Sequence, residues 1–172
     1  MDIAPILTAV TWLGAGLLVY GGATKIPVPD GAMAALHSLG LPSGRVAARL
    51  LGVAEIGLGV VIVIVGGVAA AILSAITFGL LSLVAARQRA AQIDCGCFGV
   101  HRYPVSGTHI AVNAAIAVAG AVGVTAPPWN VGAVGADAGG LAVVTAALLT
   151  ATGVGVLTNI IQRAGLAQAA RL

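Results

Sequence analysis

Residues 46–86 read VAARLLGVAEIGLGVVIVIVGGVAAAILSAITFGLLSLVAA, and only Arg49 and Glu55 among them carry a charge. The stretch is too long for one membrane-spanning helix, which needs about 20 apolar residues to cross ~30 Å of hydrocarbon. Gly66-Gly67 stands near its middle, and a glycine pair favours a turn. We therefore predict two membrane-spanning helices that are joined at the glycine pair by a very tight turn.

Three further apolar runs extend this pattern toward both ends of the chain. The first run follows Met1-Asp2, and we interpret it as a retained helix because a secretory signal carries Lys or Arg before its apolar core. Pro127-Pro128 ends the fourth run, and Trp129 then stands where an interfacial aromatic would lie. A short helix over residues 32–39, with one apolar side, is expected at the membrane interface. The five predicted spans are residues 3–24, 46–65, 68–86, 108–125 and 139–161.

The composition of the chain excludes a soluble fold. Its 172 residues are 59% hydrophobic and only 8% charged, whereas soluble chains are about 25% charged. The formal charge of +3 does not indicate a nucleic-acid partner, because the cations are spread thinly and aromatics for base stacking make up only 3%. We predict an all-α, polytopic helical bundle whose surroundings are the lipid bilayer.

The positive charges predict the orientation of this bundle. All eight Lys and Arg residues fall in the first and third connections and the C-terminal tail, which five spans place on one side of the membrane. Because Lys and Arg are enriched in cytoplasmic loops, we expect the N-terminus outside a bacterial plasma membrane and the tail inside. The cysteine-containing connection is then cytoplasmic. The cations are Lys25, Arg45, Arg49, Arg87, Arg89, Arg102, Arg163 and Arg171.

Both cysteines of the chain lie in the third connection, as Cys95-Gly96-Cys97. Thiols separated by one residue can close a disulfide, but the small ring strains it, and strained, exposed disulfides are the labile or catalytic ones. The arginines of the same connection favour a thiolate, whereas Asp94 opposes it. We favour a redox-active pair, which would make the protein a thiol–disulfide oxidoreductase.

Two other interpretations of the cysteines stay open. Adjacent thiolates suit copper(I), zinc or mercury, and His101 would then be a third ligand and His109 a fourth. Zinc sites usually leave two to four residues between cysteines, so Cys95 and Cys97 match that pattern poorly. A purely structural disulfide is the weakest interpretation, because closing so short a loop removes little chain entropy.

Glu55 is the acid inside an apolar segment, about 9 Å deeper than Arg49 along the helix. A carboxylate at that depth is costly and marks either function or a buried ion pair. We favour a structural pair with Lys25 or Arg49 over a role as proton donor to a redox or transport step. His109 and Asn113, four residues apart, share a helix face just beyond the cysteines, which makes His109 a candidate member of the same site.

These residues resemble the methylamine-utilisation MauE family, within the wider DoxX-like group of small membrane proteins. CGCFG at residues 95–99 looks like the family signature, GGATKI at residues 21–26 is similar to its ending of the first helix, and EIGLG at residues 55–59 resembles its glutamate-then-glycine run. Asn113 also matches, but Val112 precedes it where the family pattern has Arg, so no charged role carries over there. The resemblance covers residues 3–126.

The resemblance implies a four-helix MauE/DoxX-like core over residues 1–126, to which residues 127–172 add a connection, a fifth transmembrane helix and a basic tail. The family is thought to support maturation of methylamine dehydrogenase, whose small subunit is rich in disulfides, often beside a thioredoxin-like partner. Thiol–disulfide chemistry at Cys95 and Cys97 in the maturation of a partner protein is thereby implied. A non-catalytic membrane anchor subunit remains an alternative.

The predicted side of the cysteines conflicts with this chemistry. Disulfides are made outside the cytoplasm, whereas the charge bias places the pair inside. One pair cannot carry electrons across ~30 Å of hydrocarbon by itself. It would need a quinone as cofactor, a second protein, or a position deep in the bundle.

Overall fold

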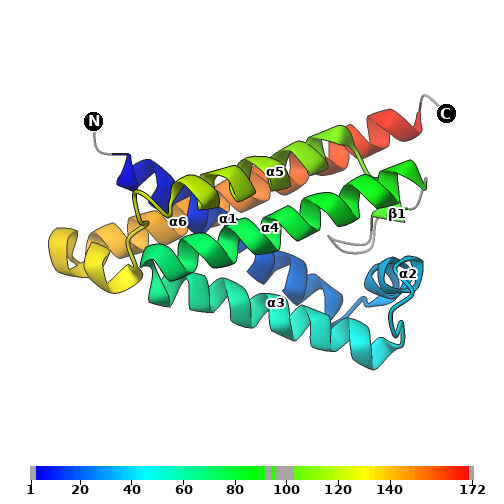
Figure 1. Ribbon diagram of the computed structural model, residues 1–172, viewed down its shortest axis with the longest axis horizontal. Helices are drawn as coiled ribbons and strands as arrows, with labels where there is room; N and C mark the ends of the chain where they lie inside the picture. The colour runs from blue at the N-terminus through cyan, green and yellow to red at the C-terminus, as the bar shows by residue number, and fades with distance from the viewer. Residues whose placement is uncertain (1–2, 92–93, 96–102, 171–172) are drawn as a thin grey trace.

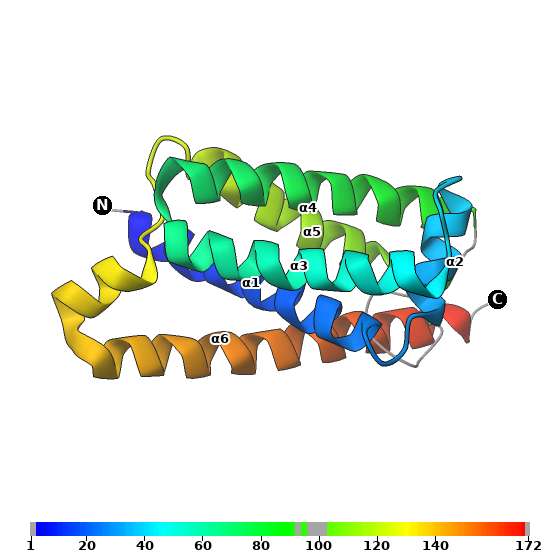
Figure 2. The same cartoon turned by 90° about the horizontal axis from the view of Figure 1, so that it is seen from below.

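The computed structural model describes residues 3–91, 94–95 and 103–170 of the chain (Figure 1). Its long helices run side by side along one axis (Figures 1 and 2), and a two-stranded antiparallel ladder closes one end. The predicted all-α bundle is confirmed. In chain order the elements are α1 (Ala4–Lys25), α2 (Asp30–Ser38), α3 (Arg45–Val65), α4 (Gly67–Ala90), β1 (Asp94–Cys95), β2 (Tyr103–Pro104), α5 (Gly107–Val122) and α6 (Val131–Ala169).

Among the described helices, α1, α3, α4 and α6 are long and apolar enough to cross a membrane. Helix α5 is apolar but has only 16 residues, about 24 Å at 1.5 Å per residue. It ends before the predicted boundary at Thr125, because the N–H groups of Val124 and Thr125 bond three residues back and tighten the chain into turns. The chain is therefore a multi-pass membrane protein with one short helix in its bundle.

The tight turn predicted between the second and third spans lies at Gly66 and Gly67. Both have positive φ, +61° and +62°, a conformation that residues with a Cβ rarely adopt. The N–H of Gly67 also donates to the carbonyl of Pro128 at 2.7 Å. This bond holds the turn against the connection that follows α5.

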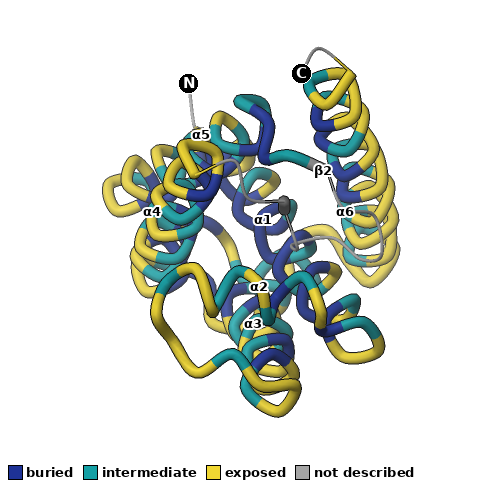
Figure 3. Tube along the Cα trace, turned by 90° about the vertical axis from the view of Figure 1, so that its right-hand side faces the viewer, coloured by how far each residue is buried: buried dark blue, intermediate teal, exposed yellow. Residues whose placement is uncertain are grey.

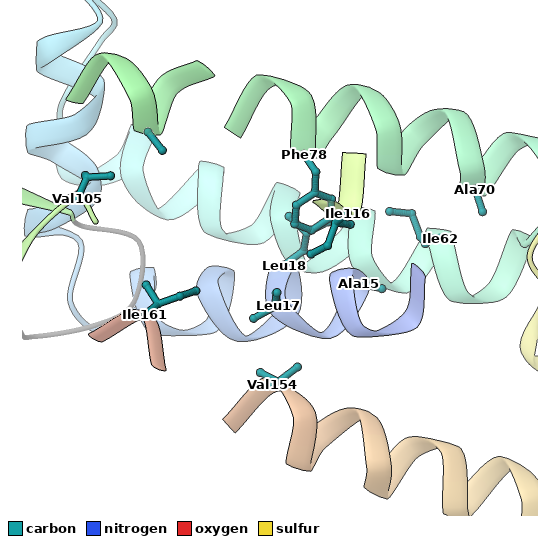
Figure 4. Close-up of a cluster of buried hydrophobic side chains, with 11 residues drawn as sticks. Ala15, Leu17, Leu18, Ile62, Ala70, Phe78, Val105, Ile116, Val154 and Ile161 are labelled. Carbon is teal, nitrogen blue, oxygen red and sulfur yellow. The ribbon is translucent and has the colours of Figure 1, made fainter. Parts of the chain in front are cut away.

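Helix α1 occupies the middle of the bundle, with α6 at one side (Figure 3). In the most apolar 18-residue stretch of each helix, 56% of the residues of α1 are buried but only 6% of those of α6. The core forms around α1, where Leu18, Phe78 and Ile116 meet from three helices (Figure 4). Most of the surface of α6 is left for lipid.

Helix α6 is longer than the predicted span of residues 139–161. Its first turns, from Val131, are set off by a kink at Gly139, whose φ is +79°. The span after the kink continues to Ala169. Residues 136–140 at the kink are exposed, and Figure 2 shows them at the end of the bundle opposite α2.

The cations of the described helices gather at one end of the bundle, which we call the cationic end. Lys25 ends α1, Arg45 begins α3, and Arg87 and Arg89 lie in the last turn of α4. Figure 2 shows these helix ends beside α2, with the C-terminal end of α6. The structure thus groups these charges as the sequence predicted, while the side of the membrane they face stays a prediction.

Candidate functional site

A buried ion pair joins α1 to α3 near the cationic end. The Nζ of Lys25 lies 2.6 Å from Oε2 of Glu55, and their side chains are only 7% and 13% exposed. Nζ also donates to the carbonyl of Gly21 at 3.2 Å. The lysine thus satisfies part of its hydrogen-bonding capacity within its own helix.

Small residues let the two backbones approach at this pair. A Cβ built on Gly52 would lie 2.7 Å from the carbonyl oxygen of Gly22 and 3.2 Å from the Cβ of Lys25. One built on Gly59 would lie 2.6 Å from the carbonyl oxygen of Ala15. In lipid, such close approach gains dispersion contacts between helices, and here it also brings Lys25 within reach of the carboxylate.

Arg49, the other cation considered as a partner of Glu55, has a different contact. Its Nε donates to the carbonyl of Ile26 at 3.1 Å, and its side chain is exposed. A basic side chain that binds a carbonyl at a helix C-terminus satisfies an acceptor that the helix leaves open. Arg49 therefore stabilises the end of α1.

Three polar side chains from α4 and α5 face the ion pair across the bundle. Gln88, His109 and Asn113 are 2%, 3% and 6% exposed. Ser106 caps α5, because its Oγ accepts the N–H of His109 at 3.3 Å. The cap fixes the start of α5 and directs His109 and Asn113, one turn apart, to the interior.

A cavity of about 50 Å³ lies between these five side chains, which we call the polar chamber: Lys25, Glu55, Gln88, His109 and Asn113. The rest of its lining is mostly apolar and includes Leu17, Leu18, Phe78 and Ile161. Figure 4 shows these four side chains in the hydrophobic core. Neither Nε2 nor Oε1 of Gln88 has a hydrogen-bond partner within the described structure. The chamber thus joins an ion pair, an imidazole and an unpaired amide within a mostly apolar lining.

Gln88 was not among the predicted site residues, although its position in the sequence indicates an interior side chain. Phe78, Leu81, Ala85 and Gln88 are spaced by three, four and three residues, which places them on one helix face. Phe78 and Ala85 are buried. A polar residue on that face indicates an interior site. However, Gln88 stands between Arg87 and Arg89, a pattern that is also typical of a solvated helix end.

The backbone of Cys95 is held across the cationic end. In the antiparallel ladder, Cys95 pairs with Tyr103 and Asp94 with Pro104. Strand β1 contacts α2 and α4, and β2 contacts α6. In the sequence, the ladder follows Gln88 of α4 by six residues and precedes His109 of α5 by five.

Cys97 and His101 lie outside the described residues, so neither the predicted redox pair nor the alternative metal ligands Cys95, Cys97 and His101 can be placed together. Within the described ranges, no three His, Cys, Asp or Glu side chains are grouped to hold a metal ion. The roles of the cysteines stay predictions.

Nearly all residues that line the polar chamber lie in a region of the chain that a protein-family model matches. The family model described as Methylamine utilisation protein MauE matches residues 3–126. The chain belongs to the MauE family. The resemblance inferred from the motifs is confirmed over the same residues. No curated protein and no solved structure matches the chain.

The MauE match includes the whole polar chamber apart from the apolar contact of Ile161, and it includes the connection with both cysteines. It ends before Val131, so α6 lies outside the matched MauE region. The family membership and the apolar helices together identify a multi-pass membrane protein of the MauE family.

Proposed function

We propose that this MauE-family protein is a membrane thiol–disulfide redox protein that supports the maturation of a disulfide-rich partner, with Cys95 and Cys97 as the exchanging pair. The observation that carries the proposal is the ladder between β1 and β2, which fixes the backbone of Cys95 over the cationic end within the matched region. The family description, which names methylamine utilisation, supports a partner of the methylamine dehydrogenase type.

The proposed exchange balances without a metal. A thiolate of the partner attacks one sulfur of the Cys95–Cys97 disulfide, breaks the S–S bond and forms a mixed disulfide. The partner's second thiolate then attacks this mixed disulfide and leaves as an oxidised partner. The partner loses two electrons and two protons, and Cys95 and Cys97 gain them as two thiols.

Charges at the cationic end support a reactive thiol. Gly107 begins α5, and a Cβ built there would lie 2.6 Å from a guanidinium nitrogen of Arg89, at the end of α4. Arg89 therefore reaches across the two helix ends that bracket the cysteine connection. A nearby guanidinium lowers the cost of forming a thiolate, which is the attacking species.

Renewed oxidation of the pair requires an acceptor of two electrons. We propose a membrane quinone, which takes up two electrons and two protons as the dithiol becomes a disulfide, or the disulfide of a thioredoxin-like protein. By the charge rule, we also propose that the cationic end faces the cytoplasm. The acceptor must then be reached from that face.

Disulfide transfer in proteoliposomes tests the proposal. The oxidised protein is mixed with a reduced, disulfide-rich test protein, and disulfides formed in the test protein are counted by mass after alkylation. We expect transfer by the wild type and none by Cys95→Ser or Cys97→Ser. A wild type that transfers nothing, but that binds copper or zinc stoichiometrically through both cysteines, would support a soft-metal protein instead. If the wild type neither transfers disulfides nor binds metal, the result would support a non-catalytic membrane anchor subunit.

A further inference from the structure

The amide of Gln88 is the least explained polar group near the site. Its side chain is 2% exposed, and both of its polar atoms lack a partner in the described structure. A buried amide that makes no hydrogen bond is strongly disfavoured, so native proteins supply such groups with protein or water partners. Gln88 lines the polar chamber, which offers space for such a partner.

The size of the chamber limits what it can hold. A buried water needs about 10–15 Å³ of such volume, whereas a ring the size of benzene occupies a cavity of about 150 Å³. At about 50 Å³, the chamber has room for about three waters and for no ring, so a quinone head would bind elsewhere. Each buried water requires two to four polar partners, and the polar side chains of the lining can donate or accept such bonds.

We propose that the polar chamber holds a small cluster of water molecules, bound by Gln88, His109 and Asn113, through which His109 exchanges protons with the Cys95–Cys97 site. The second half of this inference rests on the proposed function. Gln88 is a positioning residue that acts by holding water, and His109 is the group that accepts or donates the proton.

The charges around the chamber fit this assignment. Lys25 and Glu55 form an ion pair at 2.6 Å on the side of the chamber formed by α1 and α3. In this assignment, the waters hydrate those atoms of the pair that face the chamber. From α5 the ionisable side chain is His109, from α4 the lining contributes Gln88, and from α6 it contributes the apolar Ile161. The two ring nitrogens of the imidazole can donate and accept protons, which suits His109 to the role of proton shuttle.

Each disulfide transfer requires the chain to take up two protons with two electrons. Four residues separate His109 from Pro104, at the end of the ladder that holds Cys95. Water in the chamber would carry those protons from the imidazole toward the cysteine connection. General acid–base catalysis of this kind typically contributes about 10²–10⁴-fold to a rate.

Hydration is tested without any thiol chemistry. The full-length protein is labelled with ¹⁵N at glutamine side chains and studied in lipid bilayers by water-edited NMR, and the Gln88 amide signal is identified by its loss in Gln88→Met. We expect magnetisation transfer from water to that amide. An amide signal without transfer means a dry chamber and overturns the inference.

Proton exchange is tested by the rate at which dithiothreitol reduces the Cys95–Cys97 disulfide in H₂O and D₂O. We expect Gln88→Met to slow this reduction about tenfold or more and to raise its solvent isotope effect, because proton delivery becomes the slower step. Ser74→Ala is the matched control, since Ser74 is a buried, unpartnered polar residue on the same helix outside the chamber lining. It should leave both values unchanged.

A Gln88→Met protein that reduces at the wild-type rate with the same isotope effect contradicts the proton path. If Gln88→Met does not fold, Gln88→Asn, which keeps a shorter amide, must restore folding and part of the rate. A wild type whose cysteines never form a disulfide contradicts the proposed function and the proton path together, and the NMR transfer then decides the hydration of the chamber alone.

Discussion

The Nζ of Lys25 and Oε2 of Glu55 lie 2.6 Å apart in the interior of the bundle, where the last residue of α1 meets α3. Because the two charges are almost fully buried, each would be costly without the other. The pair therefore holds the two helices in register beside the polar chamber.

Substitution of Glu55 separates a structural from a proton-handling role. Glu55→Gln retains a hydrogen-bond acceptor for Lys25 and should assemble like the wild type. Glu55→Leu leaves a buried ammonium without its carboxylate and should lower the free energy of unfolding by about 3–5 kcal/mol. Thermal unfolding in detergent and size-exclusion chromatography measure both effects.

The double variant Lys25→Met, Glu55→Leu is the control for the lost charge pair. It should recover most of the stability that Glu55→Leu loses, because no unpaired charge remains. A Glu55→Gln protein that assembles normally but no longer exchanges thiols would contradict the structural role and make Glu55 a proton-handling residue.

The close packing of α1 and α3 predicts opposite effects at two glycines of α3. Gly52→Ala places a methyl group against the backbone of α1 and should destabilise the protein by about 1–3 kcal/mol. A Cβ on Gly57 would meet nothing within 4 Å, so Gly57→Ala should be neutral or stabilise by about 0.4–1 kcal/mol. Unfolding in mixed detergent measures the difference; equal effects of the two substitutions would refute this packing.

These two glycines also show what the sequence could and could not predict. The apolar runs predicted the positions of the long helices well, because length and lack of charge suffice to identify a membrane-spanning helix. Gly52 and Gly57 look alike in a glycine-rich segment, and only the position of α1 makes one a contact and leaves the other facing outward. From the sequence, Lys25 and Arg49 were both candidate partners of Glu55. The structure identifies Lys25 as the partner, because Gly52 and Gly22 let the two helices approach closely.

Topology is predicted by the charges at the cationic end. A reporter fused after Ala170 should be cytoplasmic, and one inserted beside Asp137, at the exposed kink of α6, should be external. Asp137 is a better position than the Gly66 turn, where a Cβ would collide with Asn130 and an insertion would disturb the fold. The reverse pattern of reporter activity would place the cysteine connection outside and overturn the orientation.

The redox state of Cys95 and Cys97 tests the central claim most directly. Because the chain has no other cysteine, the mass added by a thiol-alkylating reagent reports this pair alone. The protein in native membranes is equilibrated with defined ratios of reduced and oxidised dithiothreitol, quenched with acid and alkylated. Our account predicts two interconvertible forms, two thiols and one disulfide, with a midpoint well above about −300 mV, the range of inert structural disulfides. Two thiols at every potential, or a disulfide that no ratio reduces, would contradict it.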